Sequence, residues 1–589
     1  MTCLLEGEEL QAAYADFLAG RVQLVGWGCI APFPYYFLTS PLIPDRMIDV
    51  DPGKWGRLFC GLPTAGPESL AELSAADTVI MIYPIYAPDV VAQILSQISR
   101  MGAYRVIPPF DTARHFHLLD PLLEPFRQQP GLPRGERLAR AIERCDRPSF
   151  FTADRLVDAI AQTRLHSRFV GSAVSRRARL FIGRIQPGGA ERQLSYLAQG
   201  LARAGWDSAV RTFAPPLPGA ESYLGIGEET VNQVLPSARA FLSPEQTPDG
   251  LPTDIAPIGQ VLGLLPIDAM HHVAIAYRSL MQDRPVLVIS YLDLVNVPVA
   301  IAALLAGVPH ILVSGRNLNP THFPNHYASA ETWLKTCYEA LLRFPEVRLS
   351  ANSSAGAHSY EEWLSLPAGG VVTVPNGLPD GMLPPLAPET RTQIRERLGI
   401  PAAAALVVGV FRLADEKRPL LFVEVASLLL AAHPEAHVAL IGDGPRRSDV
   451  ETAIAGLMDG VSDRFHLVGA RSDATDYLGA ADLVLHTAWA EGHPNVLMEA
   501  QLLGCPIVCT ASYGTAECLY PCASIRVLET DQAAPLVQEA LSILADSEQA
   551  AMAARSARFW LFEHFSIRQL VTNSLAAAGV DLQTFQTPV

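Results

Sequence analysis

Short apolar runs alternate with longer amphipathic stretches along most of the chain, a pattern typical of parallel sheets whose strands are connected by helices. Most runs are followed by glycine, proline or asparagine, which predicts loops at the strand ends. The pattern occurs in three stretches and predicts an α/β fold. We expect strands at 22–25, 46–48, 78–82 and 104–107 in the first stretch, at 178–182, 286–290, 310–313, 347–351 and 371–374 in the second, and at 405–410, 438–441, 465–468, 483–485 and 507–510 in the third.

The apolar pattern weakens between these stretches, and the weak segments mark the predicted domain boundaries. Arginines and helix formers are frequent at 112–175, which predicts a helical connector. Prolines are frequent at 213–260, which predicts an insertion or long loops, and again directly after 378. We divide the chain into a Rossmann-like accessory domain (1–111), a helical connector (112–175), two further α/β domains (176–377 and 378–565) and a C-terminal helical tail (566–589).

The first predicted strand runs into Gly26-Trp27-Gly28, and Asp49 follows about 20 residues later, as in a dinucleotide-binding fingerprint. The match is incomplete, because Ala31 stands at the position of the third glycine. Pro32 and Pro34 also crowd the start of the helix that would hold the phosphate. Two interpretations of this Rossmann-like domain stay open, namely NAD or nucleotide binding and a packing or docking module.

The charge balance limits the partners of the chain. A net charge of −16 and a pI near 5.4 argue against nucleic acid and against a polybasic membrane anchor. No apolar run reaches the roughly 18 residues of a membrane span, and the first residues lack the basic start of a signal peptide. We expect a cytoplasmic protein, with peripheral contact at the inner face of the membrane and oligomerisation left open.

Nine cysteines are dispersed along the chain, which favours reduced thiols over a disulfide framework. Zinc binding by Cys505, Cys509, Cys518 and Cys522 is an alternative. However, their spacing lacks a Cys-x2-Cys pair, and two of them lie in an apolar strand pattern. We therefore expect buried thiols and no metal site.

Two loops have the composition of phosphate-binding sites. Gly188 and Gly189 join a strand to a helix, where backbone amides and the helix N-terminus favour an anion; a tight turn is the alternative. Arg412 and Lys417 follow another strand, in a chain where only three of the 44 basic residues are lysines. An arginine can form two hydrogen bonds with a phosphate while a lysine supplies a compact charge, although both could also be solvated loop residues.

Glu491 and Glu499 are separated by seven residues across a predicted junction between a loop and a helix. Ligands bind at the carboxyl ends of the strands in doubly wound sheets, so both acids are expected at that crevice. Carboxylates there favour the hydroxyls of a sugar or a ribose. The alternatives are an exposed loop acid for Glu491 and an acid near a helix N-terminus for Glu499.

Taken in order, these motifs resemble family 4 of the retaining glycosyltransferases over about residues 176–565. The resemblance implies a GT-B fold, with two Rossmann-like domains facing across a cleft and a helical stretch at 549–580 that crosses back to the first domain. The accessory domain would be an addition to this fold. The motifs are Gly188-Gly189-Ala190-Glu191, Asn376-Gly377, Arg397-Leu398-Gly399-Ile400-Pro401, Arg412 with Lys417, Gly442-Asp443-Gly444-Pro445, and Glu491 to Glu499.

The resemblance also implies roles for these residues. Arg412 and Lys417 would hold the diphosphate of a nucleotide-sugar without a metal ion, with the amides of Gly188 and Gly189 closing from the opposite domain. Glu491 would face the transferred sugar, and Glu499 would bind the ribose. The remaining residues expected to contact the donor are Gly442, Val468, Gly492, His493, Asn495 and Val496.

One position departs from the resemblance. Many relatives carry a sugar-facing histidine after the strand that we expect at 310–313, and here that position falls at Gly315 or Arg316. His322 and His326 lie further along the chain. The sugar-facing histidine is therefore unassigned.

The resemblance implies a metal-independent retaining hexosyltransferase with no cofactor besides its nucleotide-sugar co-substrate. Its acceptor would be a glycan, a lipid-linked sugar or a protein in polysaccharide or cell-surface glycan biosynthesis. The alternative is a catalytically impaired scaffold protein that retains nucleotide affinity. A sugar-nucleotide epimerase lacks support, because those enzymes do not carry the ordered set of Arg412, Lys417, Glu491 and Glu499.

Overall fold

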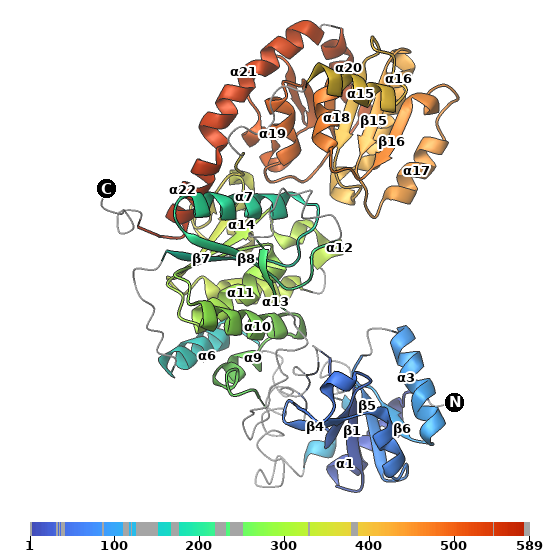
Figure 1. Ribbon diagram of the computed structural model, residues 1–589, viewed down its shortest axis with the longest axis vertical. Helices are drawn as coiled ribbons and strands as arrows, with labels where there is room; N and C mark the ends of the chain where they lie inside the picture. The colour runs from blue at the N-terminus through green and yellow to red at the C-terminus, as the bar shows by residue number, and fades with distance from the viewer. Residues whose placement is uncertain are drawn as a thin grey trace.

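Three sheets follow one another along the long axis of the computed structural model (Figure 1). Each contains strands from one continuous stretch of sequence, and helices cover both of its faces. The structure describes residues 3–30, 33, 36, 40, 42–84, 88–109, 117–118, 121–124, 151–166, 176–217, 231–235, 251–327, 330–378, 387–545 and 547–581.

The first sheet has six strands in the order β3-β4-β2-β1-β5-β6 and is parallel except for the β3–β4 pair. Its inner strand β5, between β1 and β6, is buried at every position, because α1 and α3 cover opposite faces. The elements are α1 (Gly7–Leu18), β1 (Gln23–Trp27), β2 (Arg46–Ile48), β3 (Leu58–Phe59), β4 (Leu62–Ala65), β5 (Thr78–Ile82), α3 (Pro88–Met101) and β6 (Arg105–Ile107).

The fingerprint acid of this first domain has partners within the domain. The buried Asp49 carboxylate accepts hydrogen bonds from the backbone N–H of Cys29 at 2.7 Å and of Asp51 at 2.9 Å, and it pairs with Lys54 at 3.0 Å. Because these contacts satisfy the carboxylate, the geometry favours the packing interpretation over a ribose site. Ala31, Pro32 and Pro34 lie outside the described residues.

The second sheet has seven parallel strands in the order β13-β12-β11-β10-β7-β8-β9. Helices α7 and α22 pack on one face, and α10, α11 and α13 pack on the other (Figure 1). The strands are β7 (Arg177–Ile182), β8 (Asp207–Thr212), β9 (Val231–Val234), β10 (Leu287–Tyr291), β11 (His310–Gly315), β12 (Val347–Ala351) and β13 (Val372–Thr373). The helices are α6 (Ala153–His166), α7 (Gly189–Arg203), α9 (Gly259–Leu262), α10 (Ile267–Asp283), α11 (Asp293–Leu305), α12 (Pro324–Tyr327), α13 (Glu331–Leu341) and α14 (Ser354–Leu364).

The third sheet has six parallel strands in the order β16-β15-β14-β17-β18-β19. Its strand order reverses at β14, where the chain moves from one side of the sheet to the other. The strands are β14 (Leu406–Val410), β15 (His437–Ile441), β16 (Phe465–Gly469), β17 (Leu483–His486), β18 (Ile507–Thr510) and β19 (Ile525–Leu528). The helices are α15 (Pro388–Arg397), α16 (Pro419–Ala432), α17 (Arg447–Ala455), α18 (Ala474–Ala480), α19 (Asn495–Leu502) and α20 (Ala533–Leu544).

The last two helices connect the third sheet back to the second. Helix α21 (Ser547–Phe565) packs beside α19 and α20, and α22 (Ile567–Ala577) packs on α7. A cap at Ser566 separates them, since its hydroxyl accepts a hydrogen bond from the N–H of Gln569. Where α7 and α22 cross, a Cβ on Gly200 would lie 2.6 Å from the side chains of Ile567 and Val571, so only glycine permits this approach.

None of the described helices combines the length and the apolar character that a membrane span needs. The expected strands are present in all three sheets with ends shifted by a few residues, whereas β3, β4, β8, β9 and β19 were not expected. Most of the expected connector at 112–175 and much of the proline-rich stretch at 213–260 lie outside the described residues. The domain limits therefore stay predictions.

Candidate functional site

The carboxyl ends of the second and third sheets face each other, and the loops that follow their strands meet at this junction. From the third sheet come the loops after β14, β15, β17 and β18; from the second come those after β7, β11, β12 and β13. Hydrogen bonds connect the two groups of loops, for instance from Asn376 to the carbonyl of His493 at 2.7 Å. Ligands bind at this end of parallel sheets, so the junction is the candidate site.

Lys417 and Glu491 form a buried ion pair at the centre of the junction. Lys417 lies in a single 3-10 turn after β14, and Glu491 lies in the loop after β17. The Lys417 Nζ is 2.5 Å from Oε1 of Glu491, and the His486 Nε2 is 3.0 Å from the same oxygen. Neither contact uses the Oε2 atom of Glu491, which leaves that oxygen to accept a ligand hydroxyl.

Glu491 remains ionised despite its burial. Burial by itself raises the pKa of this carboxyl, but the charge of Lys417 and the hydrogen bond from His486 outweigh it and lower the pKa to about 2. The carboxylate is therefore a fixed negative charge at neutral pH. It cannot donate a proton there, but it can orient hydroxyl groups.

Arg412 is exposed near the start of the loop that carries Lys417, and no ion pair involves it among the described residues. Its charge acts on Glu191 at the start of α7, whose pKa is raised by burial and partly lowered by Arg412. The Glu191 carboxylate folds back onto its own helix start, because a Cβ on Gly188 would lie 2.2 Å from Glu191 Oε2. Gly188 is therefore required for this packing.

Gly442 and Gly444 allow the loop after β15 to press against the loop that carries Arg412. A Cβ on Gly442 would lie 1.9 Å from the carbonyl oxygen of Phe411, and Gly442 has a φ of 147°. A Cβ on Gly444 would lie 2.5 Å from the carbonyl oxygen of Leu413. The Gly442 N–H also donates to Gly469, directly after Val468 in β16. The glycines thus place the backbone of both loops at the mouth of the junction.

Glu499 lies in the second turn of α19, as the sequence predicts, and it pairs with an unexpected partner. The Nη1 atom of Arg192, from α7 in the second sheet, donates to Glu499 Oε1. Both side chains are largely buried. No sequence pattern indicates this contact, since its partners are 307 positions apart. Arg192 therefore occupies the carboxylate that the resemblance assigns to a ribose.

Asn495 joins the two sheets through a small network of amides. Its Oδ1 accepts hydrogen bonds from Asn376 at 2.8 Å and from Gln193 at 3.1 Å, while its Nδ2 donates to the carbonyl of Gly189 at 3.3 Å. Gln193 also exchanges two hydrogen bonds with the backbone of Gly377. These contacts bring the predicted residues Gly189 and Asn495 together and fix the chain at the crossing between the sheets.

Glu517, from the loop after β18, caps a helix of the opposite sheet. Its two carboxylate oxygens accept hydrogen bonds from the N–H groups of Ser354 and Ala355 at 2.7 and 2.9 Å, at the start of α14. An anion is favoured at a helix N-terminus. Nearby, a Cβ on Gly492 would lie 2.2 Å from Asn352 Oδ1, so Gly492 permits the close approach of the loops.

Arg316 is one of the two positions, with Gly315, at which the resemblance implies a sugar-facing histidine. It directly follows β11, and its guanidinium lies 4.1 Å from the centre of the Tyr291 ring. Its Nη2 donates to Asn376, and burial lowers the pKa of Arg316. Of the two later histidines, His322 packs edge-on against Tyr513 of the third sheet.

His493 packs beside Arg316 from the third sheet and stays uncharged at neutral pH. Burial, with a smaller contribution from the Arg316 charge, lowers the pKa of His493 to about 3. Its ring contacts Phe565 edge-on at 4.8 Å. His326, the other histidine considered from sequence, is exposed and packs against Tyr327 within α12.

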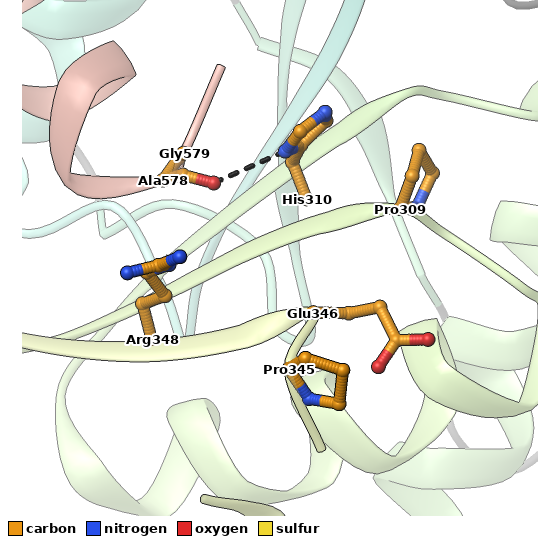
Figure 2. A pocket seen from close by; sticks show the side chains of 7 residues that line it. All are labelled: Pro309, His310, Pro345, Glu346, Arg348, Ala578 and Gly579. Atoms are coloured by element: carbon orange, nitrogen blue, oxygen red, sulfur yellow. Dashed lines mark hydrogen bonds between the residues drawn. The ribbon is translucent and has the colours of Figure 1, made fainter. Parts of the chain in front are cut away.

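A separate cavity of about 280 Å³ lies at the opposite, amino end of the second sheet (Figure 2). In Figure 2, His310 reaches the carbonyl of Ala578 at 3.1 Å, while Glu346 and Arg348 point in different directions. The cavity lacks the convergent polar groups of the junction and lies at the wrong end of the strands for the expected site. We therefore place the site at the junction.

Among solved structures, the chain is similar to HepE from Anabaena in a complex with UDP and glucose, with a TM-score of 0.54 and 20% identity. The match covers 68% of this chain and 99% of HepE. It is also similar to sucrose-phosphate synthase from Thermosynechococcus elongatus, with a TM-score of 0.51 and 19% identity over 69% of this chain and 99% of that protein. The fold is GT-B. The second and third sheets are its two facing halves, and the first sheet is an addition.

Within this GT-B fold, residues 403–546 match the family model described as glycosyl transferases group 1. The chain is 30% identical over 268 residues to the Vi polysaccharide biosynthesis protein VipC/TviE of Salmonella typhi, covering 44% of this chain and 43% of that protein. It is 32% identical over 125 residues to the putative teichuronic acid biosynthesis glycosyltransferase TuaC of Bacillus subtilis, covering 21% and 28%. The chain thus spans less than half the length of these curated relatives.

Proposed function

We propose that the chain is a glycosyltransferase that transfers a hexosyl group from a nucleotide-sugar to an acceptor hydroxyl, with retention and without a metal ion. One observation carries the proposal. The ion pair of Lys417 and Glu491 lies at the junction of the two GT-B halves, with Arg412 in the same loop as Lys417 and Glu499 in the helix that follows Glu491. The two cations suit the phosphates of a nucleotide-sugar, and the two carboxylates suit the hydroxyls of its sugar and its ribose.

Lys417 and Arg412 would stabilise the diphosphate as the glycosidic bond breaks. The Lys417 ammonium has three N–H donors and uses one for Glu491, so two remain for phosphate oxygens. Arg412 is exposed at the rim and free to add a two-pronged contact. Fixed cations are effective here because they need no reorganisation while the negative charge develops. The amides of Gly188 and Gly189 would close over the phosphates from the opposite half.

Glu491 would orient the transferred sugar through its Oε2 atom, assisted by the amides of Gly492, His493, Asn495 and Val496. The bond between the anomeric carbon and the phosphate oxygen breaks while the acceptor oxygen attacks on the same face. The acceptor proton passes to the departing phosphate oxygen, so the step needs no side-chain base. This agrees with the low pKa of Glu491, which makes it a poor proton acceptor at neutral pH.

Glu499 would bind the ribose hydroxyls, for which Arg192 must first release it. Opening of the two GT-B halves would separate this pair, since Arg192 and Glu499 belong to opposite halves. Val468 and Gly442 lie beside the junction at the ends of β16 and β15, and we propose that they contact the nucleoside. The chain itself would need no cofactor besides the nucleotide-sugar.

The acceptor that we propose is a glycan or a lipid-linked sugar of a bacterial cell-surface polymer. The names of similar proteins support this class, among them VipC/TviE, TuaC and a UDP-galactose:GlcNAc-diphosphoundecaprenol galactosyltransferase of Escherichia coli that is 30% identical over 143 residues. A protein acceptor stays the other alternative. With a lipid-linked acceptor, the transfer reaction would take place at the cytoplasmic face of the membrane.

The test is a panel of nucleotide-sugars incubated with the protein and followed by NMR for released or transferred sugar. We expect one donor to be consumed, and we expect Lys417→Ala and Glu491→Ala to lower turnover by about a hundredfold or more. Lys335→Ala and Glu424→Ala are matched controls outside the junction and should retain activity. Turnover that survives both junction variants would contradict the proposal.

One observation favours a second function. Arg192 holds Glu499, and the expected histidine is absent at both Gly315 and Arg316, so the alternative is a scaffold that binds nucleotide without transfer. The same panel separates the two functions. Thermal stabilisation by a nucleoside diphosphate without consumption of any donor supports the scaffold, and any transfer product removes it.

A further inference from the structure

Four buried polar atoms without a hydrogen-bond partner in the described part of the chain gather around Arg316. They are Arg316 Nε, Asn352 Oδ1, and both ring nitrogens of His493. The side chains of Asn352 and His493 are each 3% exposed. Buried polar groups normally find partners, so several orphaned atoms at one place indicate a polar ligand.

These three residues form one continuous group across the junction. Asn352 Nδ2 donates to the carbonyl of Arg316 at 3.1 Å. Asn376 bridges the other two, because its Oδ1 accepts from Arg316 Nη2 and its Nδ2 donates to the carbonyl of His493 at 2.7 Å. Arg316 therefore lies beside the loop after β17, which carries Glu491.

The guanidinium of Arg316 has only neutral partners among the described residues. They are Ser314 Oγ at 3.3 Å, the amide oxygen of Asn376 and the face of Tyr291. His493 adds no charge, since its pKa of about 3 keeps it neutral at pH 7. A cation that is taken out of water without a counter-charge is unfavourable unless a ligand supplies one.

Other buried arginines of this chain show the contrast. Arg179 and Arg211 pair with Asp283 at 2.8 and 2.7 Å, and Arg395 pairs with Asp482 at 2.6 Å. In each case an aspartate of the same half compensates the charge. These three guanidinium groups each have an aspartate partner, whereas the half-buried Arg316 at the junction has no carboxylate partner among the described residues.

We propose that Arg316 binds the carboxylate of the transferred sugar, and that the donor is a nucleoside diphosphate linked to a uronic acid. The inference rests on the proposed function and names its substrate class. The Nε atom and an Nη atom of Arg316 present two parallel donors, the arrangement that a carboxylate accepts. Asn352 Oδ1 and the His493 ring would take the neighbouring hydroxyls.

The position of Arg316 favours the sugar over the diphosphate. Arg412 and Lys417 already supply two cations in the third sheet, whereas Arg316 belongs to the opposite half and adjoins the Glu491 loop. Glu491 is ionised and would repel a sugar carboxylate nearby. Arg316 offsets that repulsion and lets an acid sugar approach.

The experiment compares dissociation constants within matched pairs of donors by calorimetry on the full chain. The pairs are UDP-glucose with UDP-glucuronate, UDP-galactose with UDP-galacturonate, and GDP-mannose with GDP-mannuronate. We expect the acid member of the pair with the preferred base and sugar to bind about tenfold tighter or more. An equal or tighter affinity for the neutral member in every pair overturns the inference.

Variants then test the residue itself. Arg316→Gln should reduce the acid preference to about twofold and leave the affinity for the nucleoside diphosphate alone unchanged. Arg316→Lys should retain part of the preference, because it keeps the charge and loses the two-pronged geometry. Arg203→Gln, on the exposed end of α7, is the control and should behave like the wild type.

The two proposals fail in different ways. If no nucleoside diphosphate and no nucleotide-sugar binds, the proposed function is wrong. If a neutral donor binds through Lys417 and no acid preference exists, only the inference about Arg316 is wrong. An acid preference that persists in Arg316→Gln also overturns the inference, since it assigns the carboxylate to another residue.

Discussion

At the scale of single residues, a buried group at the junction keeps its charge only where a partner stabilises that charge. Glu491 is buried but stays ionised, because Lys417 and His486 contact the same oxygen. His493, two residues later, is buried without such partners and loses its charge. The loop thus combines one permanent anion with one neutral ring.

This difference predicts acid sensitivity. The unfolded chain protonates His493 near its ordinary pKa of about 6.5, whereas the folded protein does so only near a pKa of about 3. The unfolded state therefore binds the proton first, and the free energy of unfolding falls as the pH decreases from 6.5 to 3. Glu491 acts in the same direction in a lower window, between about 4.3 and 2.

His493→Gln should remove the first contribution. Between pH 7 and pH 5 it should reduce the loss of unfolding free energy by about 2 kcal/mol, measured by urea denaturation at both values. His326→Gln changes an exposed ring and is the control. Between pH 7 and pH 5 it should lose as much unfolding free energy as the wild type. Equal pH dependence in the wild type and His493→Gln would contradict this assignment.

The sequence located those side chains that follow directly from strand ends. Lys417 and Glu491 each come a few positions after an apolar strand, so their meeting at one edge of a sheet could be predicted. Arg192 and Arg316 could not, because their contacts arise between two sheets whose relative placement leaves no local pattern. Only the expected histidine pointed to Arg316, as a departure from the resemblance.

At the scale of elements, glycines set how closely the loops of the third sheet pack. Gly442 has a φ of 147°, and a Cβ added to it would lie 1.9 Å from the Phe411 carbonyl oxygen. A side chain there must displace the backbone that leads to Arg412. The glycine therefore positions the proposed phosphate loop because it has no side chain, not through any contact with the ligand.

Gly442→Ala should lower the free energy of unfolding by roughly 3 kcal/mol, because backbone strain and the clash add. Gly456→Ala is the matched control, since its added Cβ lies 3.5 Å from the nearest atom and its φ of −84° is ordinary. It should change stability by no more than about 0.5 kcal/mol. Urea unfolding of the full chain compares them, and equal midpoints would refute the role given to Gly442.

Strands were predictable where apolar residues run without interruption, as in β14 and β15. Strand β8 was missed because Asp207 and Arg211 interrupt its pattern. The structure explains how Arg211 is buried in this strand, since Asp283 at the end of α10 compensates its charge. Strands such as β3 and β19 are short or half exposed, and their sequences carry too little pattern to be recognised.

At the scale of the whole molecule, the chain ties the two GT-B halves together at two neighbouring crossings. Leu378 donates its N–H to the carbonyl of Phe565, and Ile567 donates to the carbonyl of Leu378. Beyond them, Leu570 and Leu575 of α22 complete the core under α7. The third sheet is thus connected to the second beside the candidate site, and Arg192 and Glu499 form an ion pair between the two halves.

The central claim is that this junction holds a nucleotide-sugar between the two halves. The most direct test is a crystal structure of the full chain with the donor that the panel selects. We predict the diphosphate within hydrogen-bond distance of Arg412 and Lys417, with the sugar beside Glu491 and the ribose on Glu499. A donor bound elsewhere, or a donor at the junction that contacts none of these four side chains, would contradict the account.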